Sequence, residues 1–438
     1  MNPIHQTKLC SAKRGKNERG GIHGWHPYYA GYSEAFVESA LQHLECDKGT
    51  VVLDPWCGSG TTNIVSARSG IPSIGMEINP VMSIFAAAKT PQTLLFTNEI
   101  DQFFATLDQL IKKPRNIKPQ ENSALLNFFT PSTAEIIQAI LNGNPFTSKF
   151  SKQNGSKKNW RSELTIDAQD KVLNAPYSYV ISVVFATIRE FFSSKKSSNP
   201  TWSKSSSQIK SIKKSLLIEA IIKNHKKMIV DLETFYPNEV QKQKTLICYT
   251  DSRDSSIKSN SIDRVITSPP YLTRIDYAVS TSMEMSLLGD YAFLSYIREN
   301  TMGAPVITKS IKEQNSKWGV LCNNILVEVR QHKTKAAESY YWKNMVQYFS
   351  DAHRAICELH RVLKPSGRGL IVVQSSYFKD IEIPLGEIYV DMLKENGFNA
   401  FIAYRQEVKN HMAHVNTRSS IYKNGKVYFE DFVEFVKK

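Results

Sequence analysis

Two short segments carry residue types that suit a nucleotide-like cofactor and a flat ring that bears an amine. The first is Asp54-Pro-Trp-Cys-Gly-Ser-Gly-Thr-Thr62, and the second is Thr267-Ser-Pro-Pro-Tyr271. Each follows an apolar run that is typical of a buried strand. Because ligands of open α/β sheets bind where the strands end, we expect both segments to face one site.

The glycines of the first segment predict a sharp turn that brings the backbone close to a ligand before a helix begins near Thr61. The next strand, over 72–78, ends near Glu77, roughly 20 positions after the turn, where a carboxylate can accept hydrogen bonds from ribose hydroxyls. No lysine follows the glycines as a phosphate-binding loop requires, so an adenosine is favoured over a nucleoside triphosphate. Taken alone, the turn could also use its glycines only for packing.

The second segment follows a strand over 262–267 and is rigid before any ligand arrives. Its two prolines fix φ at about −65°, lack an N–H, and push Ser268 into an extended conformation. The turn therefore presents carbonyl oxygens and the Ser268 hydroxyl, followed by the Tyr271 ring. These groups can accept hydrogen bonds from an NH2 group and stack on its ring. An ordinary Pro-Pro turn with a packed tyrosine is the alternative, and the position behind a strand argues against it.

The two segments resemble motifs I and IV of the S-adenosylmethionine-dependent DNA amino-methyltransferases, which methylate cytosine N4 or adenine N6. The resemblance implies S-adenosylmethionine as the cofactor and a catalytic role for Ser268, Pro269, Pro270 and Tyr271. It implies cofactor contacts from the first segment and the next strand, namely Asp54, Trp56, Gly58, Ser59, Gly60, Thr61 and Glu77. The segment 26–32 resembles the one that closes over the methionine end of the cofactor, which adds His26 and Tyr28. Asp251 resembles the acid that meets the adenine amino group.

The fold that this resemblance implies is α/β, a doubly wound Rossmann-like methyltransferase sheet with a mostly helical insertion. The segment 361–373 resembles the helix, turn and fifth strand of that fold. We expect a discontinuous catalytic domain over 22–90 and 245–438. Residues 91–244 would form a helical, basic insertion that is a candidate DNA-binding region, and 290–345 a second recognition insertion.

The net charge of +14 lies mostly in that insertion. Residues 147–230 hold 16 Lys and Arg against 5 Asp and Glu, a balance of +11. Lys195, Lys196, Trp202 and Lys204 form a candidate track for a phosphate backbone. A solvated loop whose charge serves only solubility is the alternative.

Arg274, close after the proline turn, is a further candidate DNA contact. The alternative for this residue is an ion pair with Asp276 that caps a helix over 280–288.

Composition excludes several classes of protein. Six cysteines without C-x-x-C spacing indicate neither a zinc site nor a disulfide framework, so we expect no metal and a reducing cytoplasm. The longest apolar stretch, around 180–188, is far shorter than the ~18 residues of a membrane span. A soluble, cytoplasmic, nucleoid-associated protein of a bacterium or archaeon is expected. No Pro-Cys pair occurs, which argues against cytosine C5 chemistry.

The expected function is that of a site-specific DNA methyltransferase acting on cytosine N4 in duplex DNA, as the modification enzyme of a restriction-modification system. The serine that opens the proline turn favours cytosine, because turns that open with Asp or Asn are mostly associated with adenine in the resembled family. Double-stranded DNA is the expected partner, with a cognate restriction endonuclease acting on the same site. Adenine N6 is the close alternative. An RNA or protein amide methyltransferase and a catalytically dead DNA-binding regulator remain as further alternatives.

Overall fold

A computed structural model gives the fold of the chain. It describes residues 9–15, 17–27, 31–112, 124–146, 172–192, 209–236, 244–272, 276–289, 292–307, 314–408 and 426–438.

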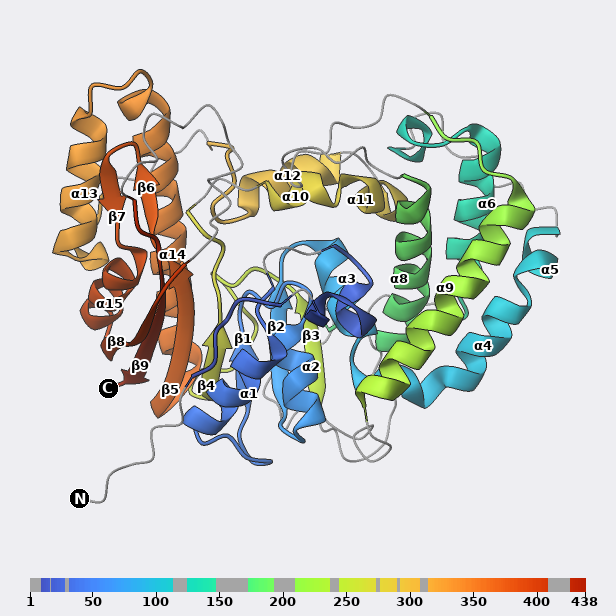
Figure 1. The fold of residues 1–438 in the computed structure, drawn as a ribbon, viewed down its shortest axis with the longest axis horizontal. Helices are drawn as coiled ribbons and strands as arrows, with labels where there is room; N and C mark the ends of the chain where they lie inside the picture. Colours follow the sequence, from blue (N-terminus) through green and yellow to red (C-terminus); the bar gives the residue numbers. More distant parts are fainter. Residues whose placement is uncertain are drawn as a thin grey trace.

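A seven-stranded sheet forms the centre of the described structure, in the order β3-β2-β1-β4-β5-β9-β8 (Figure 1). The strands are β1 (Val52–Asp54), β2 (Ser73–Glu77), β3 (Thr245–Tyr249), β4 (Ile262–Thr267), β5 (Leu363–Gln374), β8 (Phe398–Glu407) and β9 (Phe429–Lys437). Strands β1 to β5 are parallel, whereas β9 runs antiparallel to both β5 and β8. The order reverses between β1 and β4, which is where ligands of doubly wound sheets bind.

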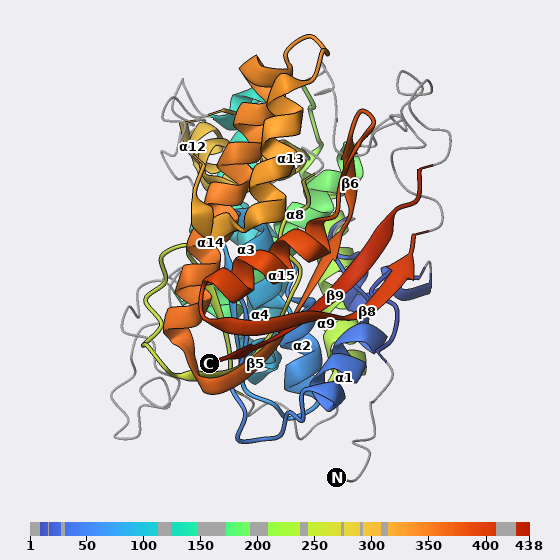
Figure 2. The same ribbon diagram turned by 90° about the vertical axis from the view of Figure 1, so that its left-hand side faces the viewer.

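Both faces of the sheet are buried, and successive side chains of a strand enter different cores. Leu370 and Val372 lie in one hydrophobic cluster, while Ile371 and Val373 lie in the other. The first core contains helices α1 (Glu34–His43), α2 (Thr61–Arg68) and α3 (Pro80–Ala88). The second contains α13 (Val320–Gln331), α14 (Lys343–Val362) and α15 (Leu385–Glu395). Figure 2 shows α15 lying across β8 and β9.

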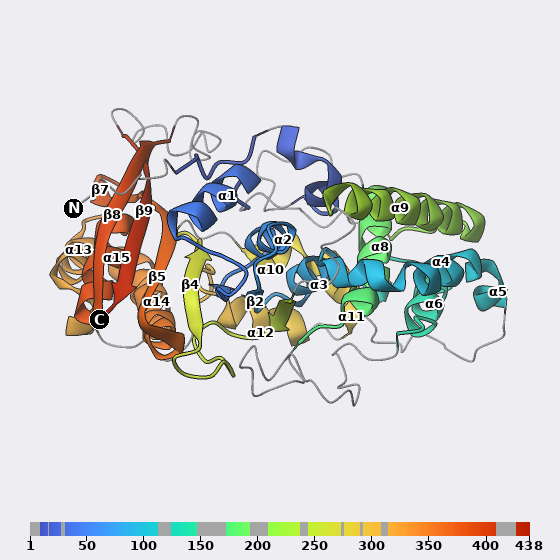
Figure 3. The same ribbon diagram turned by 90° about the horizontal axis from the view of Figure 1, so that it is seen from below.

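A helical bundle lies beyond the β3 edge of the sheet, at the end of the molecule opposite β8 and β9 (Figure 3). Its helices are α4 (Thr97–Ala105), α5 (Leu107–Lys112), α6 (Pro131–Asn142), α8 (Ala175–Phe191) and α9 (Lys214–Phe235). Helix α8 packs against α3 and α9, so the bundle shares the first core with the sheet. Within the described ranges, no helix has the length and apolar character needed to cross a membrane.

Three short helices follow the proline turn and span the top of the molecule in Figure 1, between the bundle and α14. They are α10 (Tyr277–Ser280), α11 (Ser282–Leu288) and α12 (Ala292–Asn300). A small hairpin of β6 (Ser376–Phe378) and β7 (Ile381–Ile383) follows β5.

The observed elements confirm the predicted fold class, a doubly wound α/β sheet with a helical insertion. The strand over 262–267 and the helix start at Thr61 are as predicted. The predicted helix over 280–288 divides into α10 and α11, with Thr281 between them.

Candidate active site

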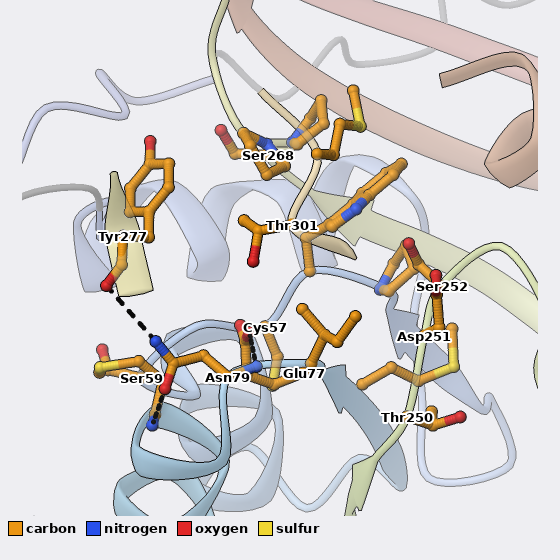
Figure 4. A pocket seen from close by; sticks show the side chains of 18 of the residues that line it. Cys57, Ser59, Glu77, Asn79, Thr250, Asp251, Ser252, Ser268, Tyr277 and Thr301 are labelled. Carbon is orange, nitrogen blue, oxygen red and sulfur yellow. Dashed lines mark hydrogen bonds between the residues drawn. The ribbon is translucent and has the colours of Figure 1, made fainter. Parts of the chain in front are cut away.

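A pocket lies at the carboxyl ends of β1 to β4, and its empty space of about 1030 Å³ includes open solvent. Figure 4 shows side chains from both sequence segments facing into it, with Ser268 on one side and Glu77 and Asp251 on the other. Of the predicted residues, those that line the pocket are Trp56, Ser59, Thr61, Glu77, Asp251, Ser268, Pro269, Pro270 and Tyr271.

The glycine turn between β1 and α2 depends on backbone conformations that favour glycine. Gly58 has a φ of 51° and Gly60 a φ of 86°. A Cβ on Gly60 would lie 3.0 Å from the Cβ of Ala86, so α3 leaves no room for a side chain there. Gly58 and Gly60 do not line the pocket themselves, but they set the path of the backbone between residues that do.

Glu77, at the end of β2, holds the glycine turn in place. Its carboxylate accepts hydrogen bonds from the backbone N–H of Gly58 at 3.0 Å and of Asn79 at 2.7 Å. Burial raises the pKa of this carboxyl to about 7 despite these bonds. A carboxylate has about four acceptor positions, so it can still accept bonds from hydroxyls of a ligand.

Asp54 joins the two sequence segments directly beside the pocket. This carboxylate is buried and accepts hydrogen bonds from the hydroxyls of Thr267 at 2.6 Å, Thr62 at 2.7 Å and Tyr32 at 2.8 Å. Thr267 is the last residue of β4 and immediately precedes Ser268. Asp54 does not line the pocket; its hydrogen bonds connect the glycine turn to the strand that leads into the proline turn.

Asp251 lies two residues beyond β3 and is held by a neighbouring guanidinium. Arg253 donates to both Asp251 carboxylate oxygens, at 2.9 Å and 2.5 Å, and also to Asp351 on α14 at 2.6 Å. The Asp251 side chain is still 31% exposed, which leaves acceptor positions open to the pocket.

The proline turn is held by two tyrosine hydroxyls. The Tyr271 hydroxyl is hydrogen-bonded to the side chain of Ser268, and burial raises the pKa of this phenol. The Tyr348 hydroxyl donates to the Pro270 carbonyl at 2.9 Å. The Ser268 hydroxyl and the Pro269 carbonyl are further acceptors of the turn, and both residues line the pocket.

Several lining residues were not predicted from the sequence. Asn300, Thr301 and Met302 come from the end of α12 and the residues after it, and no local pattern pointed to them. Asn79 caps α3 by accepting from the N–H of Val81, and its amide donates to Thr281 at 3.0 Å. The Asn-Pro pair before α3 is a helix-start signal that could have indicated this residue.

Two cations also lie close to the glycine turn without having been predicted. Arg14 donates to the Thr61 hydroxyl and the Tyr32 carbonyl, each at 2.9 Å. Lys89, 1% exposed, donates to the Ser59 carbonyl at 3.3 Å, and burial lowers its pKa to about 7. Neither side chain lines the pocket, so both stabilise the glycine turn through these hydrogen bonds from outside the pocket.

His26 lies behind the pocket in a buried cluster and does not line it. Its Nε2 is 3.5 Å from a carboxylate oxygen of Glu284 on α11, and its ring packs against Phe85. Arg189 of α8 pairs with the same carboxylate and donates to its second oxygen at 2.6 Å. Burial acts to raise the pKa of Glu284, but Arg189 and His26 outweigh it and lower that pKa to about 2.

The remaining predicted residues lie outside the described ranges, namely Tyr28, Lys195, Lys196, Trp202, Lys204 and Arg274. Asp276, the proposed partner of Arg274, caps α10 by accepting from the N–H of Val279 and pairs with Arg298 at 2.8 Å. In the part of the chain that the structure describes, no group of three or more His, Cys, Asp or Glu could hold a metal ion.

Comparisons with known proteins agree with this geometry. The model of the N6/N4 DNA methylase family matches residues 3–87. Type II methyltransferase M.BsoBI of Geobacillus stearothermophilus is 24% identical over 91% of this chain and 82% of its own. Type II methyltransferase M.AvaI of Nostoc sp. strain PCC 7120 is 21% identical over 86% of this chain and 78% of its own.

The family model thus covers the first part of the chain, and the two type II methyltransferases are similar to most of it. The predicted resemblance is thus confirmed, and with it S-adenosylmethionine as the cofactor of this methyltransferase. A solved structure of a 16S rRNA (adenine(1408)-N(1))-methyltransferase from Catenulisporales acidiphilia, with the cosubstrate S-adenosylmethionine, matches 49% of the chain and 70% of its own, at 9% identity. Its TM-score of 0.20 is too low to support a structural argument.

The pocket of this DNA methyltransferase fits that cofactor. Glu77 and Asp251 supply carboxylate acceptors near the ends of adjacent strands, as ribose hydroxyls and an adenine amino group would require. Trp56, Ile78 and Met82 supply apolar surface for a purine ring. The donor and acceptor set therefore suits an adenosine.

Proposed function

We propose that this chain is a site-specific DNA methyltransferase that transfers a methyl group from S-adenosylmethionine to the exocyclic N4 amine of cytosine in duplex DNA. The observation that supports this most is that the Ser268–Tyr271 turn and the acids Glu77 and Asp251 line one pocket. The serine that opens the turn favours cytosine over adenine. The type II methyltransferases named above span most of the chain, which supports a role in a restriction-modification system with a cognate endonuclease.

The turn makes a poor nucleophile reactive. The lone pair of a cytosine amine is delocalised into the ring, so the nitrogen attacks only when acceptors draw its hydrogens towards tetrahedral geometry. The Ser268 hydroxyl and the Pro269 carbonyl are the acceptors that we assign to this task, because both residues line the pocket. The nitrogen would form a bond to the methyl carbon as the carbon–sulfur bond breaks and S-adenosylhomocysteine leaves. The nitrogen would then lose one of its protons to solvent, so no strong general base is needed.

The cofactor contributes an electrophilic sulfonium methyl group. The task of the protein is therefore to align the amine nitrogen with that methyl group and to exclude water. Asp251 and Glu77 would hold the adenosine end of the cofactor, with Trp56, Ser59 and Thr61 lining the same pocket. Asp54, Gly58 and Gly60 set the shape of the backbone around it. His26 and Tyr28 stay predicted contacts of the methionine end.

A base in a duplex must leave the stack to reach this pocket, at a cost of a few kcal/mol. Stacking on an aromatic side chain such as Tyr271 is worth about 1–3 kcal/mol and offsets much of that cost. Lys195, Lys196, Trp202, Lys204 and Arg274 stay candidate DNA contacts. We assign the catalytic domain to 22–90 and 245–438, DNA binding to 91–244, and a second recognition role to 290–345.

Adenine N6 is the second candidate, because the amine chemistry at the turn is the same. Duplex DNA methylated by the purified protein, digested to nucleosides and analysed by mass spectrometry, distinguishes the two. We expect N4-methylcytosine. Finding only N6-methyladenine would overturn the assignment of the base. Methylation of RNA or protein, but not of DNA, would overturn the proposed substrate class.

A further inference from the structure

The proline turn lacks the backbone donors that usually fix a turn. Pro269 and Pro270 have no N–H, so the orientation of the turn depends on its carbonyl groups and on packing. The Pro270 carbonyl accepts a hydrogen bond from the hydroxyl of Tyr348 on α14, at 2.9 Å. Tyr348 is 1% exposed, and its hydroxyl lies 3.4 Å from the hydroxyl of Tyr389 on α15.

The same part of the chain also holds the segment after α12, here called the strap, which comprises residues 300–306. The side chains of Asn344, Gln347 and Tyr340 donate to strap carbonyls at residues 304, 306 and 305, at 2.9 Å, 3.0 Å and 3.1 Å. The first strap residues, 300–302, line the pocket. Three successive carbonyls of the strap are thus hydrogen-bonded to α14 and to the short helical segment before it, Ala337–Trp342.

The strap also packs closely against the proline turn. Gly303 has a φ of 76°, and a Cβ there would lie 3.1 Å from the Tyr271 carbonyl oxygen and 3.6 Å from the Tyr348 ring. Because a side chain at this position would crowd the turn, the strap and Tyr348 together leave the turn little freedom.

One turn further along α14, Asp351 serves the cofactor side of the pocket. It accepts from Arg253 at 2.6 Å, and Arg253 in turn holds the Asp251 carboxylate and donates to the Asn300 carbonyl at 2.8 Å. Helix α14 therefore supports the target side of the pocket through Tyr348 and the cofactor side through Asp351.

We infer that Tyr348 is a positioning residue for methyl transfer, whose hydroxyl sets the orientation of the Ser268–Tyr271 turn and thereby aims its acceptors at the target amine. This inference rests on the proposed function. Misplacing a reacting group by about 1 Å can cost about 100-fold in rate. Loss of the hydroxyl leaves the Pro270 carbonyl without its donor, so the turn can move while the cofactor side stays in place.

Three variants of the full-length protein test the inference. Tyr348→Phe removes the hydroxyl that donates to the Pro270 carbonyl. Tyr389→Phe is the matched control, because it removes the neighbouring hydroxyl, which does not contact the turn. Asp351→Asn weakens the ion pair with Arg253 on the cofactor side of the pocket. For each variant we would measure kcat and KM on duplex DNA, the Kd of S-adenosylhomocysteine by calorimetry, and the melting temperature.

We expect Tyr348→Phe to lower kcat by about 10- to 100-fold, with the S-adenosylhomocysteine Kd and the KM for DNA within about twofold of the wild type. Tyr389→Phe should keep kcat within about threefold. Asp351→Asn should raise the Kd by about tenfold and change kcat less at saturating cofactor. A second variant, Tyr348→Met, must lower kcat at least as far as Tyr348→Phe.

Equal losses of kcat in Tyr348→Phe and Tyr389→Phe would overturn the inference, as would a loss of cofactor affinity in Tyr348→Phe as large as its loss of turnover. A wild-type protein that binds S-adenosylhomocysteine but methylates no DNA would instead overturn the proposed function. The two failures are therefore distinguishable.

Discussion

At the scale of single residues, Glu77 holds the glycine turn with the same carboxylate that we propose for binding the cofactor. It holds the glycine turn through Gly58, and burial raises its pKa to about 7. The ionised form accepts hydrogen bonds at both oxygens, whereas the protonated form loses part of that capacity. Cofactor binding should therefore respond to pH in the neutral range.

We predict that the affinity for S-adenosylhomocysteine rises as pH rises through 7. A carboxyl with a pKa of about 7 is mostly protonated at pH 6 and mostly ionised at pH 8, so the affinity of a site that needs the ionised form rises about tenfold over that range. Calorimetry at pH 6, 7 and 8 measures this. In Glu77→Gln the affinity should be lower and nearly independent of pH; an unchanged pH dependence in that variant would assign the titration to another group.

Tyr271 belongs to the same scale, because it lines the pocket next to Ser268, where we propose that the target base binds. We predict that Tyr271→Ala mainly slows turnover, by about 10- to 100-fold, since stacking of about 1–3 kcal/mol is lost only when the base is held in the pocket. Single-turnover kinetics would measure the effect. Tyr271→Phe keeps the ring but loses the hydroxyl bonded to Ser268, so a smaller loss in this variant than in Tyr271→Ala assigns the difference to stacking. Retention of full activity in Tyr271→Ala would contradict a stacking role.

At the scale of elements, the Asp54 carboxylate connects β1 to β4, and thereby the proposed cofactor side of the pocket to its proposed target side. Asp54 accepts from Thr267, Thr62 and Tyr32, which belong to β4, α2 and the segment before α1. Hydrogen bonds to a buried charged group contribute more than neutral ones, and their donors are costly to leave without a partner. The relative placement of both motifs therefore depends on this carboxylate.

We predict that Asp54→Ala lowers the free energy of unfolding by about 3 kcal/mol and weakens cofactor binding by about tenfold or more. Chemical denaturation and calorimetry with S-adenosylhomocysteine measure the two effects. The control is Asp47→Ala on the exposed loop before β1, which should leave cofactor affinity unchanged. Unaltered cofactor affinity in Asp54→Ala would show that the hydrogen bonds of Asp54 do not shape the cofactor site.

The turns of the site could be predicted from the sequence, whereas the contacts between its elements could not. The strand ends, the glycine turn and the proline turn follow local rules, since Gly60 and the prolines restrict their own backbone. The strap, Arg14 and Tyr348 reach the site through contacts between residues that are distant in sequence. Local patterns carry no information on such contacts, so these residues were found only in the structure.

At the scale of the whole molecule, the bundle shares the first core with the sheet, and an ion pair to a buried carboxylate joins the bundle to the helices after the proline turn. Arg189 of α8 in the bundle binds Glu284 of α11, just after the proline turn, and also donates to the Ser280 carbonyl at 3.0 Å. Ser280 lines the pocket. The basic insertion is therefore attached to the residues that follow the proline turn.

The positive charge of the bundle allows a test of its proposed role in DNA binding. Lys223, Lys226 and Lys227 lie exposed on α9 at positions that share one helix face. We predict that replacing all three by Gln reduces the slope of log K against log salt for duplex DNA, by about 0.9 for each phosphate that the variant no longer neutralises. Fluorescence anisotropy at several salt concentrations measures the slope.

A control variant, Lys48→Gln with Lys394→Gln, removes exposed charges at other places on the molecule and should leave the slope unchanged. If the α9 variant and this control had equal slopes, the charge of α9 would serve solubility and not DNA binding.

The two motif segments together are proposed to build one site for methyl transfer to a DNA amine. Transfer of tritiated methyl from S-adenosylmethionine to duplex DNA, measured for the wild type and Ser268→Ala alongside their S-adenosylhomocysteine affinities, tests this most directly. We predict labelled DNA with the wild type, and at least about a 100-fold slower transfer with unchanged cofactor affinity in Ser268→Ala. Equal transfer rates for the two proteins, or no labelled DNA with a wild type that binds the cofactor, would contradict the proposal.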